Sequence, residues 1–485
     1  MQDFYGKIMI FDLYFFTGIR NIDVILPKIM SKKQYIPTEL GEENVGRLLV
    51  QYAAPAIVAM IASSVYNIVD SIFVGQGVGD LAISGMAVAS PFMNLGAAFG
   101  AMVGVGASTV ISVRLGQGKY AAAQNILGNA ITMNIILGTL FTFTCLYYLR
   151  PILTIFGASE ATMPYAYKYM RIILAGNIVS HSYLGLNAIL RSAGHPKAAM
   201  NCTFLTIAVN TILDPLFIFV MKWGIEGAAW ATIVSQAIAL AVQLKLFSRK
   251  SELLHLRHGI YRLRADIVRQ CLAIGLSPFL MNSCACLVVL IINNRLLQYG
   301  GDLSIGAFGI VNRVVFLFVM TVFGLVQGMQ PIVGYNWGAR KNERVWKVLR
   351  YTILAATAIT TAAAITGECV PGYVTRIFGA GEELTAVAER AFRIIVVMYP
   401  IVGAQMVIGN FFQSIGHAGK SIFLSLSRQL LLLLPLLTVL PPRYGLDGVW
   451  MSMPISDGIS FFLATGLLTY QIIRMRRHET DRVAK

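Results

Sequence analysis

Long apolar segments recur along the whole chain and restrict the folds that it can adopt. Runs of more than about 18 predominantly apolar residues are long enough to cross a bilayer whose hydrocarbon core is about 30 Å thick. Of the 485 residues, 56% are hydrophobic and only 13% are charged, whereas a soluble domain carries about twice that charged share. The sequence therefore predicts an all-α polytopic membrane protein.

Apolar windows between charged residues or Gly/Pro breaks predict twelve transmembrane helices. Windows of this kind place the ends of a span to within a few residues. The predicted spans are 47–74, 81–113, 121–149, 161–190, 197–221, 225–248, 268–296, 303–336, 345–371, 384–413, 419–441 and 446–473.

Basic residues are concentrated in alternate loops. Arg114, Lys119 and the stretch 340–350 lie on one side of the predicted bundle, whereas Glu160 and Asp302 lie in loops on the other. By the positive-inside rule, both termini of this multi-pass chain are cytoplasmic, in a cell inner (plasma) membrane. The same rule explains the net charge of +16, so we expect the lipid bilayer, and no nucleic acid, as a partner.

The first 44 residues form a predicted N-terminal cytoplasmic segment. Residues 1–29 have neither the basic start nor the small-residue cleavage site of a signal peptide. From Met30 the chain reads "MSKKQYIPTELGEENVGRLL", which is typical of a polar cytoplasmic start. The hypothesis is that Met30 is the initiator and that 1–29 is an over-extended start.

The two halves of the chain repeat each other. "LTIFGASE" at 153–160 returns as "TRIFGAGE" at 375–382, "RSAGH" at 191–195 as "QSIGH" at 413–417, and "GDLAI" at 79–83 as "GDLSI" at 301–305. All three pairs are separated by the same distance along the chain. A common offset over the whole chain indicates an internal duplication of six spans.

An even number of spans per repeat leaves both halves in the same orientation, related by a pseudo-two-fold axis along the membrane normal. The expected lobes are 45–248 (spans 1–6) and 268–475 (spans 7–12), joined by a cytoplasmic linker at 249–267 and followed by a cytoplasmic tail at 476–485. Two such lobes can enclose a cavity and expose it to either side by rocking, which favours a carrier over a pore or an enzyme. A monomer suffices for this.

Three carboxyl groups lie deep in the apolar spans: Asp70 in span 1, Asp214 in span 5 and Asp457 in span 12, whereas Glu368 lies near the end of span 9. A carboxyl at the bilayer centre costs several kcal/mol and is a functional candidate by default. Asn210 and Asp214 are four residues apart and share a helix face, and Pro215 lacks an N–H, so carbonyls one turn earlier are expected to be free. Such oxygens suit Na⁺, and crowded, desolvated carboxyls equally suit a proton.

The same residues have other interpretations. Asp70 and Asp214 could instead cap broken helices or pair with amide groups. The six cysteines and six histidines show no metal-ligand spacing. A membrane-embedded prenyltransferase would need two Asp-rich motifs, which are missing from the sequence, so we expect no enzyme activity and no cofactor.

Several motifs together resemble the bacterial branch of the multidrug and toxic compound extrusion (MATE) family. The resemblance covers about 45–475. Its most specific parts are "VDSIFVG", "AILRSAGHPKAAM", "NTILDPLFIF", "GAAWATIVSQ" and "FGLVQGMQPIVGYNWGARK". It implies a twelve-helix, two-lobe fold and export of organic, often cationic, compounds in exchange for Na⁺ or H⁺.

When the residues of the family's cation or proton site are matched with this sequence position by position, the resemblance places that site in the first lobe. The matching residues are Asp70, Asn210, Asp214 and Thr232, with Asn187 matching less closely. An acid pair used by another branch is replaced here by Asn293, Asn294 and Gln405 in the second lobe. The candidates for the substrate cavity are Phe92, Met93, Met281, Gln330 and Asp457.

The expected function is multidrug antiport, with Na⁺ and H⁺ both open as the coupling ion. The alternative within transport is a lipid-linked saccharide flippase of a related superfamily branch. Flippases of that kind carry more basic residues in their cavity-forming spans, whereas Arg313 is the main basic residue in the spans of this chain.

Overall fold

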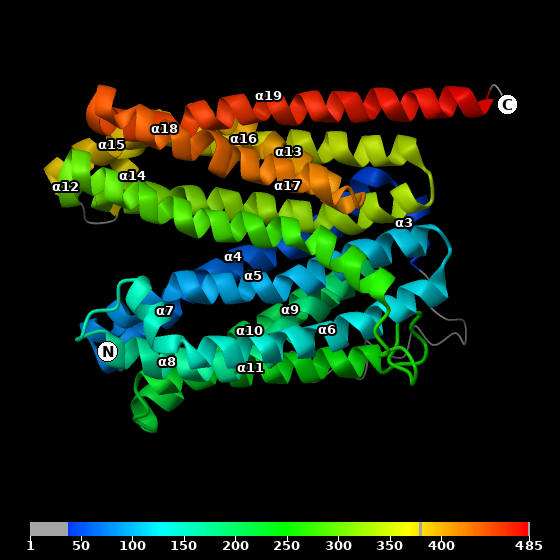
Figure 1. The fold of residues 1–485 in the computed structure, drawn as a ribbon, viewed down its shortest axis with the longest axis horizontal. Helices are drawn as coiled ribbons and strands as arrows, with labels where there is room; N and C mark the ends of the chain where they lie inside the picture. Colours follow the sequence, from blue (N-terminus) through cyan, green and yellow to red (C-terminus); the bar gives the residue numbers. More distant parts are fainter. Residues whose placement is uncertain (1–36, 378–380, 484–485) are drawn as a thin grey trace.

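The computed structural model describes residues 37–377 and 381–483, and these residues are almost entirely helical (Figure 1). The hypothesis of a start at Met30 falls outside the described residues. The first half begins with α3 (Glu39–Glu42), α4 (Val45–Val78), α5 (Asp80–Gly116) and α6 (Tyr120–Tyr147). It continues with α7 (Leu149–Ile155), α8 (Met163–Ala175), α9 (Asn177–Ser192), α10 (Pro196–Pro215), the π-helical segment η3 (Leu216–Val220) and α11 (Ile225–Phe247).

The second half begins with α12 (Ala265–Gly338), α13 (Asn342–Cys369), α14 (Pro371–Ile377) and α15 (Glu382–Val396). It continues with α16 (Tyr399–Ser414), α17 (Ala418–Leu426), the π-helical segment η4 (Ser427–Leu433), α18 (Leu434–Val439) and α19 (Pro441–Val483). In Figure 1, α12 lies beside α4 and α5, between the remaining helices of the two halves.

Twelve membrane spans can be assigned within the described residues. Nine helical stretches are long and apolar enough to cross a bilayer, and two more spans are the bent pairs α8–α9 (57°) and α15–α16 (52°). The 74-residue α12 counts as one of the nine, but its backbone leaves helical geometry at Gly301. A straight helix of that length would measure about 110 Å, so α12 supplies two spans. The predicted fold class is confirmed.

The internal repeat is visible in the backbone. Gly79 and Gly301 both have positive φ angles, of 106° and 68°, and both start the second span of their half. Gly194 and Gly416, with φ of 94° and 79°, end equivalent helices. Even Arg340, a non-glycine residue at φ 60°, is the counterpart of Gly118, at φ 71°, by the same offset. The repeat therefore preserves turn geometry even where it has lost the glycine that usually provides it.

The buried apolar residues of the described chain form three clusters. One cluster contains residues of both halves, and each of the other two belongs to a single half. The largest joins both halves at the end of the bundle where the basic loops lie, and it includes Leu48, Ile111, Val326 and Ile332. The other two are each confined to one half, around Phe92 and Leu174 in the first and around Phe392 and Trp450 in the second. The halves thus share a core at the basic end and have separate cores towards the other.

Close backbone approaches hold the shared core together. At Gly106 of α5, an added Cβ would overlap the backbone of Cys271 in α12, and at Gly338 of α12 it would overlap the backbone of Val113 in α5. Glycine lets two helices approach this closely in lipid, where dispersion and packing replace the hydrophobic driving force. These contacts explain why α5 and α12 pack side by side at the basic end.

The N-terminal segment ties the first half to the second at the same end. Its backbone carbonyls accept hydrogen bonds from the second half: Leu40 from Asn336 Nδ2 at 2.8 Å, Gly41 from Lys341 Nζ at 2.8 Å, and Glu43 from Arg344 Nη2 at 2.6 Å. The carbonyl groups therefore help to hold the basic end closed.

The stretch between the halves packs on α6. Asn129 Nδ2 donates to the carbonyls of Ile260 and Arg262 at 3.2 and 3.1 Å, and its Oδ1 accepts from the Arg264 N–H at 2.8 Å. The limits of the lobes at 45–248 and 268–475, with the linker at 249–267 and the tail at 476–485, stay a prediction.

The glycine contacts predict opposite effects for two alanine substitutions. Gly106→Ala is expected to lower the melting temperature of the purified protein, because its methyl group overlaps the Cys271 backbone. The control is Gly309→Ala in α12, where an added Cβ meets no atom within 4 Å and alanine improves helix propensity by up to about 1 kcal/mol. Equal melting temperatures for the two variants would contradict the proposed packing.

Candidate functional site

Five side chains from three spans of the first half converge on a polar cluster. Tyr66 and Asp70 lie one turn apart on α4, Asn210 and Asp214 one turn apart on α10, and Thr232 lies on α11. Along the helices, Asp70 is about 12 Å from the Val78 end of α4, which is the end opposite the basic loops. The cluster therefore lies in the half of the bundle that is away from the basic loops and from the shared core.

A change of helix type follows Asp214 directly. Pro215 has no N–H to donate to the preceding turn, and the next residues continue as the π-helical segment η3. The N–H of Leu216 bonds to the carbonyl of Leu213, and that of Met221 bonds to the carbonyl of Leu216 at 2.9 Å. Short π-helical segments inside α-helices are frequent at functional sites, and this one fixes the end of α10 at the acidic residue.

Asn210 connects the cluster. With its amide oriented to donate to the acid, its nitrogen lies 2.5 Å from Asp214 Oδ2 and 3.1 Å from the Tyr66 hydroxyl. Its oxygen then accepts from the Thr232 N–H at 3.1 Å. Asn210 and Asp214 are fully buried, so these bonds operate in surroundings where water cannot compete.

The carboxyl groups of Asp70 and Asp214 lie near each other, and no lysine or arginine among the described residues forms an ion pair with either of them. They lie close enough to interact directly, and Asp70 and Asp214 are 7% and 0% exposed. Oδ1 of each acid is buried and has no hydrogen-bond partner among the described residues. Two carboxylates this close in a low-dielectric setting cannot both stay ionised and unscreened, so the geometry requires a proton or a cation.

The chemistry of the cluster indicates a hard cation rather than a transition metal. No group of three or more His, Cys, Asp or Glu residues that could hold a metal ion occurs in 37–377 and 381–483. The available ligands are carboxylate, amide and hydroxyl oxygens, which suit hard cations, whereas transition metals favour imidazole and thiolate. The structure brings Asp70, Asn210, Asp214 and Thr232 together, and their role in ion coupling stays a prediction.

The cluster also contains two tyrosines that we did not predict from the sequence. The hydroxyls of Tyr66 and Tyr169 lie near both acids and near the Thr232 hydroxyl. Tyr66 precedes Asp70 by one helical turn, so the spacing alone could have identified it. Tyr169 lies on α8, which carries no other member of the cluster. No neighbouring residue in the sequence therefore indicates that Tyr169 belongs to the site.

Asn187 belongs to a different network. Its Nδ2 donates to the Ala199 carbonyl at 3.0 Å, and its Oδ1 accepts from Arg191 Nη1 at 2.5 Å. Because its amide is engaged near the basic end of α9, the structure does not place it in the hydrogen-bonded cluster around Asp70 and Asp214. A role of Asn187 in ion coupling stays a prediction that these contacts do not support.

The residues expected in the substrate cavity occupy varied surroundings. Phe92 is buried in the core of the first half, where its ring centre lies 6.3 Å from that of Phe141 and 5.9 Å from that of Phe156. Met93 packs against the same core. Met281 and Gln330 are half-buried on α12, and their place in a substrate cavity stays a prediction.

Asp457 is neutralised within the second half. It is 4% exposed, and Arg428 Nε donates to its Oδ1 at 2.7 Å. Arg428 lies in η4 and Asp457 in α19. A buried acid with its own guanidinium partner has little need of an ion from solution, so the structure favours a structural role for Asp457 over the substrate-cavity role expected from the sequence.

The fold and the site together define a polytopic helical transporter with two six-span lobes and an acidic cluster in one of them. The family model described as MatE matches residues 55–216 and 274–439, so the chain belongs to the MATE family of multidrug transporters. The first matched stretch contains Asp70, Asn210 and Asp214. A protein of this family is a transporter and not an enzyme.

Relatives and solved structures agree with this assignment. The chain is 25% identical over 424 residues to the multidrug export protein MepA of Staphylococcus haemolyticus, covering 87% of this chain and 93% of the relative. MepA of Staphylococcus aureus is 23% identical over the same length. Among solved structures, the MATE multidrug transporter DinF-BH in complex with R6G shares 33% sequence identity with this chain. The two folds match with a TM-score of 0.83 over 91% of this chain and 98% of that one.

A second solved structure supports the fold alone. It is the outward-facing conformation of a multidrug resistance MATE family transporter of the MOP superfamily, with 23% identity and a TM-score of 0.86 over 92% of this chain and 99% of that one.

The contact between the two acids predicts strong energetic coupling. Asp70→Asn and Asp214→Asn each remove one of two crowded charges, so the stability changes of the single variants should not add in the double variant. We expect a coupling free energy of about 0.5–3 kcal/mol, as is usual for residues in contact, measured by a double-mutant cycle on detergent-purified protein.

The control cycle pairs Asp70→Asn with Asp447→Asn. Asp447 belongs to the second half and binds Arg390, so its effect should add to that of Asp70 within about 0.5 kcal/mol. Additive behaviour in both cycles would show that the two acids do not sense each other.

Proposed function

We propose that this protein is a secondary active antiporter that exports organic, often cationic, compounds in exchange for Na⁺ or H⁺. The observation that carries the proposal is the pair of buried carboxyl groups of Asp70 and Asp214, each with one oxygen lacking a partner among the described residues. A carrier needs a site whose charge changes when an ion binds, and this pair is built for such a change.

The proposed cycle uses the ion to control affinity for the cargo. A cation or proton that enters between Asp70 and Asp214 removes the negative charge of the cluster and thereby weakens binding of a cationic compound. Coupling of this kind is reciprocal, because the cargo weakens ion binding by the same factor. Loss of the ion restores the charge and readies the protein for another molecule of cargo.

The position of the acids within the bundle supports ion entry from outside the cell. The basic loops mark the cytoplasmic end if the positive-inside rule holds, and this is also the end at which both halves share one core. The acids lie towards the opposite end, where each half has its own core. In this arrangement the lobes are joined on the cytoplasmic side, and the ion reaches the cluster from the exterior.

The two lobes must separate at the cytoplasmic end to release the ion. Separation would break the contacts of Gly106 and Gly338 and the hydrogen bonds to the carbonyls of Leu40, Gly41 and Glu43. It would form a new contact between the outer cores. Rocking between two such packed arrangements is the alternating access that we propose, in a multi-pass inner (plasma) membrane protein with both termini cytoplasmic and with a monomer as the working unit.

The flippase alternative receives less support. A carrier of lipid-linked saccharides needs positive charge to bind a diphosphate, whereas Arg428 of the second half is paired with Asp457. The same transport assay separates the two functions when a lipid-linked saccharide replaces the drug.

Removal of the charge at Asp70 should stop ion-driven transport. In everted membrane vesicles, Asp70→Asn is expected to reduce gradient-driven ethidium transport at least tenfold, because one carboxyl alone no longer requires an ion. The matched control is Asp447→Asn, an acid outside the cluster, which should transport normally at equal expression. Normal transport by Asp70→Asn would exclude the acid pair as the coupling site.

The coupling ion can be identified at constant pH. Purified protein in liposomes is given either an inward Na⁺ gradient without a pH difference or a pH difference without Na⁺, and drug transport is followed. Na⁺ coupling requires five or six oxygens around the ion, which Tyr66, Tyr169 and Thr232 could complete, whereas a proton needs only the acid pair. Transport under only one of the two gradients identifies the coupling ion as Na⁺ or H⁺. Transport under neither gradient would contradict antiport.

A further inference from the structure

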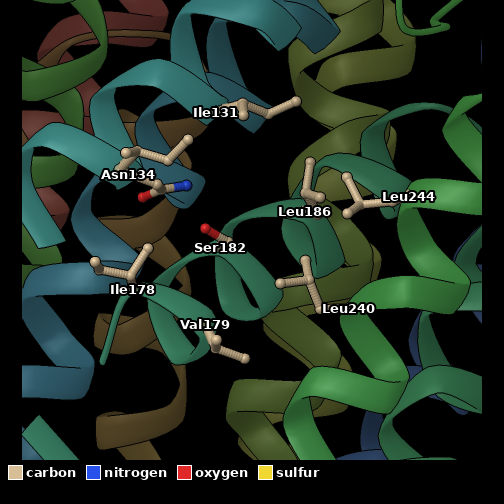
Figure 2. Close-up of a pocket in the computed structure, with 9 residues that line it drawn as sticks. Ile131, Asn134, Ile178, Val179, Ser182, Leu186, Leu240 and Leu244 are labelled. Carbon is tan, nitrogen blue, oxygen red and sulfur yellow. The ribbon is translucent and has the colours of Figure 1, made fainter. Parts of the chain in front are cut away.

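The first half contains a second site that the transport cycle does not use. A cavity of about 230 Å³ lies between α6, α9 and α11, and Figure 2 shows its lining. Its walls are mainly aliphatic side chains: Ile131 and Ile135 of α6, Ile178 and Leu186 of α9, and Leu240 and Leu244 of α11. Thr232 of the acidic cluster is eight residues before Leu240, about 12 Å away along α11, so the two sites are separate.

The position of the cavity follows from the bend between α8 and α9. The two helices meet at 57°, and at Gly176 between them the space that a Cβ would need is filled by the side chain of Ile233 from α11. Ile178 and Val179, which follow directly, already form part of the cavity wall. Ile135 is 47% exposed on the apolar surface, so the cavity opens towards the lipid.

Two polar side chains interrupt this apolar lining. Figure 2 shows the amide of Asn134 and the hydroxyl of Ser182 directed towards the same space. They are 1% and 9% exposed. Asn134 Oδ1 has no hydrogen-bond partner among the described residues, and the hydroxyl of Ser182 forms no hydrogen bond with the rest of the described chain.

An unpaired buried amide is costly, by about 1–3 kcal/mol per unsatisfied group. Asn134 nevertheless fits closely against α9, because Gly185 has no side chain and a Cβ there would overlap its Nδ2. An aliphatic side chain would fill the site without that cost, so the amide and the hydroxyl are explained best by a ligand that pairs with them.

We infer that this cavity binds a small apolar molecule, of about one substituted ring, that carries a hydroxyl group. An apolar cavity of about 150 Å³ is sufficient for benzene. The cavity here, at about 230 Å³, therefore admits a ring with a short substituent. A hydroxyl both donates and accepts, and it therefore pairs with Asn134 in either amide orientation and with Ser182. A lipid acyl chain would leave both polar groups unpaired, and charged headgroups lie at the membrane surface, about 20 Å along α6 from Asn134.

The test compares two probes that differ in one hydrogen-bond donor. Full-length protein in nanodiscs is titrated with 4-trifluoromethylphenol and with its methyl ether, 4-trifluoromethylanisole, and binding is followed by ¹⁹F NMR with unlabelled 4-ethylphenol as competitor. We expect saturable phenol binding about tenfold tighter than ether binding, the factor given by about one buried hydrogen bond.

Two variants then assign the binding to this cavity. The double variant Asn134→Leu/Ser182→Ala should bind phenol and ether equally, and Leu186→Trp should abolish saturable binding of both by filling the space. Asn125→Leu, on the same helix but not part of the lining, should behave like the wild type. The double variant is expected to fold, because replacing unpaired buried polar groups by apolar ones is neutral or stabilising.

Three results would overturn the inference. They are equal affinity of the wild type for phenol and ether, a preference for phenol that persists in the double variant, and displaceable binding that survives Leu186→Trp. Failure to find any saturable binding in the wild type would overturn it as well. None of these outcomes bears on the acid pair, since ion-driven transport is measured separately.

Discussion

The unneutralised pair of Asp70 and Asp214 is the constraint on which the proposed function of this transporter depends. Both carboxyls are buried in the membrane-spanning part of one lobe, and the described chain supplies amide and hydroxyl groups around them but no lysine or arginine. A hydrogen bond from Asn210 stabilises one negative charge. Two charges at this distance need more than hydrogen bonds, and that deficit makes the cluster responsive to an ion from solution.

The proposed alternating access also requires two alternative packed arrangements of the lobes. The packing of the bundle is consistent with this requirement. At the basic end, α5 and α12 meet backbone to backbone at Gly106 and Gly338, and the N-terminal segment bonds across to Asn336, Lys341 and Arg344. At the other end each lobe is packed on itself. Close-packed interfaces of this kind change between discrete states and do not deform gradually, so binding energy at the acid pair can be used to shift a population.

Much of the fold could be predicted from the sequence because the duplication and the lipid environment both leave clear patterns. The common offset between the repeats identified Gly79 with Gly301 and Gly194 with Gly416, and the structure confirms that each pair has the same unusual backbone. Apolar length identified the spans, but it could not reveal the sharp bends within α8–α9 and α15–α16. Such bends depend on contacts between helices that are distant in sequence.

The site was only partly predictable for the same reason. Asp70, Asn210 and Asp214 stand out as polar residues in apolar segments, and the resemblance to a family supplied Thr232. Tyr169 could not be found, because a tyrosine in a membrane span is common and its position near the acids comes from packing of α8 against α11. Asn187 lies outside the cluster because it is one turn before Arg191 and uses its amide there.

The comparison between the lobes explains why the duplication did not double the coupling site. Both lobes keep the turn glycines, and each carries a π-helical segment in its fifth span. In the second lobe, however, the buried acid Asp457 has Arg428 as a partner, and Gln405 donates to Ser460. Asp457 thus has a cationic partner within its own lobe, whereas no described lysine or arginine pairs with Asp70 or Asp214. Divergence therefore preserved the symmetric frame that the proposed rocking requires, while the uncompensated acid pair was confined to one lobe, where we propose that a single ion-binding event biases the whole bundle.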